Sequence, residues 1–163
     1  MPDDQSHQKE LRSEVGKMRR AVGMSDLSKA ITSEQWERVI QICQTRPSSA
    51  QTWTTRHGLF EGIKDASVLP IHEALVAGAP LEAVEALLSA YPDSVYCMES
   101  SYKRLPLHCA CRKNAIVQVI ELLLKSYADA ALTADNLGRL PCKLSNFSII
   151  SFWSEDNLTC TKC

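Results

Sequence analysis

Residues 105–131, LPLHCACRKNAIVQVIELLLKSYADAA, decide the fold that this sequence predicts, because parts of the stretch recur along the chain. Its opening, LPLHCA, matches LPIHEA at 69–74 and, more faintly, LPCKLS at 140–145. The copies are separated by 105 − 69 = 36 and 140 − 105 = 35 residues. A fixed period of about 20 to 50 residues is typical of a solenoid, in which each unit buries its apolar face against its neighbours. The sequence therefore predicts a stack of repeated units.

Each of the two clear units predicts a pair of helices. Pro70 and Pro106 suit the first turn of a helix, where the missing N–H is not needed, so a first helix begins at each. Second helices are expected over 81–90 and 116–127. Four apolar residues are expected to form the buried stripe of the later one: Val117, Ile120, Leu123 and Leu124.

A helix before these units repeats their pattern in weaker form. Its apolar residues at i, i+3, i+4 and i+7 form one amphipathic stripe: Trp36, Val39, Ile40 and Cys43. Thr32 and Ser33 offer its N-cap, with Thr32 at capping-box spacing from Gln35, and Pro47 ends it. Its apolar positions match those of the later second helices at offsets of 45 and then 36 residues, which predicts a degenerate first unit. The nine extra residues of the first interval (45 − 36) predict a long finger with a turn at 57–58.

On this interpretation the chain has three parts. They are a flexible N-terminal arm (1–31), a repeat domain (32–146, with units at about 32–68, 69–104 and 105–139 and a partial unit from 140) and an irregular apolar C-terminal cap or tail (147–163). The arm is polar and mixed in charge, so it cannot offset its ordering entropy by burial. The tail either folds back onto the last unit or belongs to a truncated repeat, and the sequence leaves both open.

Composition narrows the class of protein. A chain of 163 residues suits one domain, and Lys+Arg 18 against Asp+Glu 19 removes the electrostatic case for nucleic acid. No apolar run approaches the roughly 18 residues that a membrane-spanning helix needs. Seven scattered cysteines and a start without a basic, apolar leader predict a reduced cytoplasmic protein, with the nucleus as an alternative.

The repeated pattern resembles the ankyrin repeat: L-P-L-H-x-A, a turn, a leucine-rich helix and D-x-x-G-R before the next L-P. The matching positions are Leu69, Pro70, His72, Leu105, Pro106, His108, Leu140 and Pro141. The resemblance implies an all-α, helix-turn-helix solenoid of about three repeats with irregular ends. The chain departs from the family in having Leu where Thr precedes Pro, and in units longer than the usual 33 or so residues.

His72 and His108 are the residues most easily mistaken for catalysts. His72 and Glu73 start like a zinc-protease helix, but H-E-x-x-H needs a second histidine where Val76 stands. In ankyrin-like stacks these imidazoles hydrogen-bond backbone between units. Without a phosphate-binding loop or a nucleophile elbow, the sequence predicts no catalytic residue, no cofactor and no metal.

The cysteines support one alternative function. Cys160 and Cys163 form a C-x-x-C pair, so a thiol or metal-binding protein using them stays open. Cys109 and Cys111 lie about 200° apart around a helix and cannot both face one ion. Measuring bound zinc in the native protein, together with thiol counting, separates this alternative from a binding module.

The ankyrin resemblance implies a protein-protein interaction module, a scaffold or adaptor that acts as a monomer. Partners of such stacks are contacted by loop tips and by the exposed face of the first helices. Carried over by position, the expected partner-binding residues are Ser101, Tyr102, Arg104, Arg112, Lys113, Asn136 and Arg139. Because the set is basic with one aromatic anchor, it predicts an acidic peptide or acidic surface as partner.

Overall fold

The computed structural model describes residues 24–60 and 65–144. Six α-helices follow one another in pairs there: α2 (Asp26–Thr32) and α3 (Trp36–Thr45), α4 (Pro70–Val76) and α5 (Leu81–Ala90), α6 (Pro106–Arg112) and α7 (Val117–Ser126). A short 3-10 helix follows each pair: η1 (Pro47–Gln51), η2 (Pro92–Tyr96) and η3 (Ala128–Leu132). A fourth, η4 (Pro141–Leu144), comes after η3. The mostly helical fold that the sequence predicts is confirmed.

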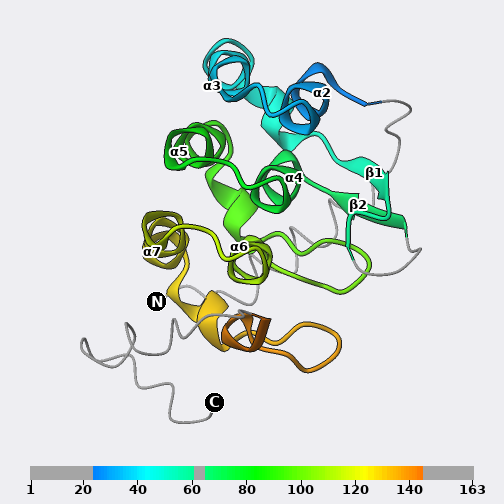
Figure 1. The fold of residues 1–163 in the computed structure, drawn as a ribbon, viewed down its shortest axis with the longest axis vertical. Helices are drawn as coiled ribbons and strands as arrows, with labels where there is room; N and C mark the ends of the chain where they lie inside the picture. The colour runs from blue at the N-terminus through cyan, green and yellow to red at the C-terminus, as the bar shows by residue number, and fades with distance from the viewer. Residues whose placement is uncertain (1–23, 61–64, 145–163) are drawn as a thin grey trace.

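The helices lie in two layers (Figure 1). α4 packs between α2 and α6 in one layer, and α5 packs between α3 and α7 in the other. Each short first helix begins at a proline or a capping residue, and each longer second helix ends just before a 3-10 turn. The period of 35 to 36 residues in the sequence therefore corresponds to one helix pair.

Helix α2 corrects the boundary of the N-terminal arm. Ser25 caps it, because its Oγ accepts a hydrogen bond from the Ser28 N–H at 3.1 Å. Leu27 and Ile31 are buried one turn apart, so the arm predicted for 1–31 already packs on the core in its last residues. Thr32 ends α2 and is not the N-cap of α3. The remainder of the arm, 1–23, lies outside the described residues.

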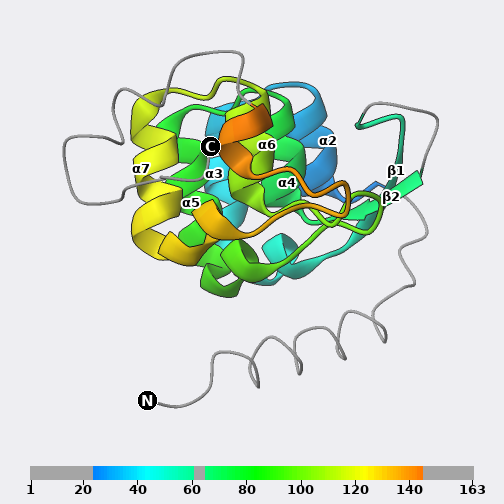
Figure 2. The same ribbon diagram turned by 90° about the horizontal axis from the view of Figure 1, so that it is seen from below.

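The expected finger is a β-hairpin, which corrects the all-α fold class. Strands β1 (Thr54–His57) and β2 (Asp65–Val68) pair antiparallel, with Thr54 opposite Val68. Alternate residues of β2, Ala66 and Val68, are fully buried, and β-branched residues favour such a half-buried strand. Gly58 follows β1 with φ 65°, as a turn at that position requires. Figure 2 shows the hairpin on the side of α2, α4 and α6 that faces away from α7.

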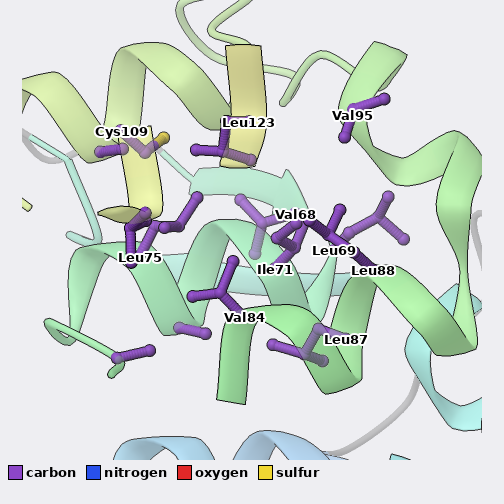
Figure 3. Close-up of a cluster of buried hydrophobic side chains, with 14 of the residues drawn as sticks. Val68, Leu69, Ile71, Leu75, Val84, Leu87, Leu88, Val95, Cys109 and Leu123 are labelled. Carbon is purple, nitrogen blue, oxygen red and sulfur yellow. The ribbon is translucent and has the colours of Figure 1, made fainter. Parts of the chain in front are cut away.

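The core joins both layers and the hairpin (Figure 3). Leu75 of α4, Val84 of α5 and Leu123 of α7 belong to this one cluster of buried side chains. The stripe predicted for α7 is wrong at its start, because Val119 is buried and Val117 is 46% exposed. Val117 is the first residue of the helix, just after the turn that follows α6.

The C-terminal cap predicted for 147–163 lies outside the described residues. The described chain ends with η4, which packs against α6 at the start of the expected partial unit. Within 24–60 and 65–144, no helix is both long enough and apolar enough to cross a bilayer.

Truncating a buried leucine of α7 tests the packing between layers. Leu123→Ala should lower the free energy of unfolding by about 2 to 5 kcal/mol, because Leu123 is 2% exposed and its loss leaves a cavity. Leu132→Ala is the matched control: Leu132 is 69% exposed, and the change should cost no more than about 0.5 kcal/mol. Urea unfolding followed by circular dichroism measures both. Equal effects of the two substitutions would contradict the packing described.

Candidate functional site

His72 ties the start of α4 to the backbone just after η2. Its Nδ1 accepts a hydrogen bond from the Leu69 N–H at 3.3 Å, one of the donors that a helix start leaves unpaired. Nδ1 is therefore unprotonated, and Nε2–H donates to the Cys97 carbonyl at 3.0 Å. The expected bond to backbone is present at His72, but Cys97 belongs to the same unit (69–104), so the bond lies within a unit and not between units. The imidazole satisfies backbone groups on both sides and is fully buried, so it is a structural residue.

His108 repeats half of this arrangement. Its Nδ1 accepts from the Leu105 N–H at 3.2 Å, whereas its Nε2 makes no hydrogen bond within the part of the chain that is described. Burial lowers the pKa of His108 against the charge of Asp135 and the backbones of Arg139 and Thr133, which raise it; Thr133 stands 36 residues after Cys97. Burial lowers the pKa of both His72 and His108 to about 4.

These histidines should make stability fall on acidification. An unfolded histidine titrates near about 6.5. Between that value and the folded pKa of about 4, the unfolded state binds more protons, so the free energy of unfolding decreases as pH falls. The slope should reach at most about 1.4 kcal/mol per pH unit for each histidine. Urea unfolding between about pH 7 and pH 5 measures it.

The double variant His72→Gln, His108→Gln is the control for this pH dependence. Glutamine at the third helical position can accept the same backbone N–H bond but does not titrate. Asp135, whose folded pKa lies below its ordinary 3.8, titrates outside this window. The variant should therefore lose most of the slope. A wild-type protein equally stable at pH 5 and pH 7 would contradict the assignment.

Two buried carboxylates hold the loops that precede α6 and η4. Glu99 accepts hydrogen bonds from the N–H groups of Ser101 (2.6 Å), Tyr102 (2.7 Å) and Arg104 (3.0 Å). Asp135, 36 residues later, does the same for the backbone of its own loop through Oδ1. We call residues 99–104 and 135–139 the finger loops. A carboxylate can accept several such bonds, so each loop closes around one side chain.

The finger loops share a backbone position that explains the glycine of D-x-x-G-R. Gly138 has φ 73°, a conformation that costs little without a Cβ. Lys103 stands 35 residues earlier with φ 57°, and it is exposed. The earlier loop therefore keeps the same backbone shape without a glycine.

Neighbouring loops are joined to one another by their backbones. The Ser100 N–H donates to the Ser67 carbonyl of the hairpin at 3.1 Å, and the Asn136 N–H donates to the Tyr102 carbonyl at 2.9 Å. The Asn136 side chain also donates to the Ser101 carbonyl at 3.1 Å. The hairpin and both finger loops thus form one connected row. Ser101 and Asn136, predicted as partner contacts, also help to build that row.

Arg104 is not on the surface, and its prediction as a partner-binding residue is wrong. Its side chain is 0% exposed, with Nε 3.4 Å from the Asp135 carboxylate. The guanidinium lies 4.4 Å from the centre of the Tyr102 ring and 5.5 Å from that of Phe60. Aromatic faces attract a cation at such distances. The loop-tip position alone predicted exposure, but rings from two different loops cover this side chain.

Asp135 pairs with two arginines. Besides Arg104, it receives Arg139, whose Nε and Nη2 each lie 3.1 Å from Oδ2. Burial alone would raise the pKa of Asp135, but hydrogen bonds from the Arg139 and Leu137 backbone and the charge of Arg139 together lower it below its ordinary value. Arg139 is 32% exposed, so its guanidinium pairs with Asp135 and still faces solvent in part.

Removing the charge of Asp135 should be strongly destabilising. Asp135→Asn keeps the shape but leaves Arg104 as a buried charge without a counterion, at a cost of about 3 to 5 kcal/mol in the free energy of unfolding. Asp129→Asn, at an exposed carboxylate of η3, should change it by no more than about 0.5 kcal/mol. Chemical denaturation compares the two. An Asp135→Asn cost below about 1 kcal/mol would contradict the anchoring role.

The structure divides the seven predicted partner-binding residues into three groups. Lys113 and Asn136 are exposed, Arg104 is buried, and four are partly exposed: Ser101, Tyr102, Arg112 and Arg139. The structure also exposes apolar side chains at Leu137 (58%), Ile116 and Val117; Leu137 is a loop-tip position that the ankyrin resemblance implies, whereas the exposure of Ile116 and Val117 was not expected. The sequence position of these residues indicates their exposure. Leu137 stands just before the glycine with positive φ, and Ile116 precedes the helix and therefore does not belong to its buried stripe.

No group of three His, Cys, Asp or Glu side chains within 24–60 and 65–144 could hold a metal ion. Cys109 and Cys111 are fully buried, and burial raises the pKa of each thiol to about 12. Such thiols are unreactive in the folded protein. The alternative metal pair, Cys160 and Cys163, lies outside the described residues.

Comparison with known families places part of the chain. The family model named Ankyrin repeat matches residues 102–136. This segment runs from one finger loop through α6, α7 and η3 to the next, and its two ends touch, since the Asn136 N–H donates to the Tyr102 carbonyl. No curated protein matches the chain significantly.

Proposed function

Because this chain is an ankyrin-repeat protein, we propose that it is a non-catalytic protein-interaction module whose helix pairs form a solenoid of about three units. The observation that supports this most directly is the row of linked loops. The finger loops are held by buried carboxylates and still present exposed side chains, among them Asn136 and Leu137. A loop whose backbone is already fixed loses little conformational entropy on binding.

The proposed surface comprises the exposed parts of the third unit. Its finger loop contributes Leu137, and the corner between α6 and α7 contributes Lys113, Ile116 and Val117. Exposed apolar side chains beside charged ones are typical of interaction sites. This surface replaces the wider basic face that the sequence predicted, because Arg104 is buried.

We further propose an acidic, partly apolar protein segment as the partner. Lys113 and the partly exposed Arg112 lie together at the C-terminal end of α6, and Arg139 keeps some exposure above its ion pair with Asp135. These charges would attract carboxylates, while Leu137 and Val117 would accept apolar side chains. We expect the module to act as a monomer, in the cytoplasm or the nucleus.

Affinity capture with matched variants tests this function. The double variant Lys113→Gln, Leu137→Ser removes one exposed charge and one exposed apolar side chain from the proposed surface. It should lower the affinity for a captured partner about tenfold. Contacts at the centre of an interface each contribute on the order of 1 kcal/mol or more. The affinity should also fall as the salt concentration rises.

Lys125→Gln, Leu132→Ser is the control. It makes the same two changes at exposed residues at and after the end of α7, away from the finger loops, and should leave the affinity unchanged. Loss of binding in the control alone, or in neither variant, would overturn the proposed surface.

A further inference from the structure

A groove runs between α5, η2 and α7, in the layer that does not carry the finger loops. It is an open depression with a volume of about 580 Å³, and its lining includes Glu85, Leu88, Asp93, Val95, Tyr96 and Leu122. We call it the outer groove. Its volume falls within the range of about 300 to 1,000 Å³ that is common for binding pockets.

Unequal packing of the second helices accounts for the groove. α5 packs extensively against α3 but only lightly against α7, so the second interval between these helices is more open. η2 borders the opening, and the ring of Tyr96 of η2 contacts that of Tyr127 after α7, with ring centres 4.7 Å apart and the ring planes tilted by 57°. This aromatic contact holds the chain after α5 and the chain after α7 together, which keeps the groove walls in place.

The floor of the outer groove is apolar and its charged lining is acidic. Leu88 and Val95 are buried, and Leu122 is half-buried. Glu85 is exposed and Asp93 is partly exposed, and no lysine or arginine is among the described residues that line the groove. Lys125, next to the lining residue Ser126, is exposed and offsets the two negative charges in part. The combination favours a ligand that is both cationic and apolar.

We propose that the outer groove is a second interaction site, which binds a basic, aliphatic segment of a partner protein. A lysine or arginine of the segment pairs with Glu85 and Asp93, and its leucine-like side chains cover Leu88, Val95 and Leu122. An arginine also finds the ring of Tyr96, since aromatic faces attract guanidinium groups. Acidic peptides and nucleic acids are repelled by the same carboxylates. The site consists of other residues than the surface proposed for the third unit, although α7 contributes to both, and it prefers a partner of opposite charge.

Two labelled peptides test the proposal on the full chain. The probe is fluorescein-labelled Ala-Leu-Arg-Leu-Lys-Ala-Leu, and its counterpart carries Glu in place of Arg and Lys. Fluorescence anisotropy should show binding of the basic probe that weakens with salt, and much weaker binding of the acidic one. Nuclear magnetic resonance should show amide shifts concentrated at residues 85–96 and 122–126. The double variant Glu85→Gln, Asp93→Asn should weaken the basic probe about fivefold, as expected for losing two partly exposed ion pairs.

The repeat supplies the matched control. Glu121→Gln, Asp129→Asn makes the same charge change 36 residues later (121 − 85 and 129 − 93), outside the lining of the outer groove, and should leave the affinity unchanged. Lys113→Gln, Leu137→Ser should also leave it unchanged, which separates this site from the proposed function. Four results would each overturn the proposal: both peptides bind equally well, the control variant loses as much affinity as Glu85→Gln, Asp93→Asn, the amide shifts lie elsewhere on the chain, or the basic probe does not bind up to about 1 mM.

Discussion

The buried carboxylate of Asp135 is the interaction on which the third helix pair most depends. It closes its own finger loop through two backbone N–H groups and at the same time holds the guanidinium of Arg104 from the preceding loop. Buried charges are tolerated in a protein only when they are paired and hydrogen-bonded. Asp135 therefore couples two units by a polar contact where the apolar core alone would leave the loops free to move relative to one another.

His72 adds a second buried polar link, between the first helix of its unit and the loop that leads to the next pair. Its ring bridges the start of α4 and the backbone beyond η2, while leucine and valine side chains fill the space between the layers. The division of roles is clear: apolar residues supply most of the burial, and a few buried polar side chains fix how one pair lies on the next. Both the surface proposed for the third unit and the outer groove result from the way the helix pairs are stacked.

Sequence periodicity predicted the helix pairs well, because L-P-x-H repeats where a helix start must satisfy its free N–H groups and the leucines repeat on one face. Periodicity did not predict the burial of a side chain correctly where segments distant in the sequence determine that burial. Arg104 looks like a loop-tip cation until Phe60 and Tyr102 are placed around it. Val117 has the right spacing for the stripe but stands at an open corner. Helix α2 was missed because Leu27 and Ile31 are too few to mark a stripe without the pairs that follow.

The buried thiols are distributed so that every helix pair of the described chain, or the turn after it, contains at least one: Cys43 in α3, Cys97 after η2, and Cys109 with Cys111 in α6. Burial raises the pKa of all four, so each is protected from alkylating reagents while its surroundings stay closed. The rate at which each thiol becomes accessible therefore reports opening of its own segment. The chain carries an internal set of probes that distinguishes fraying from one end of the stack from cooperative unfolding of the whole.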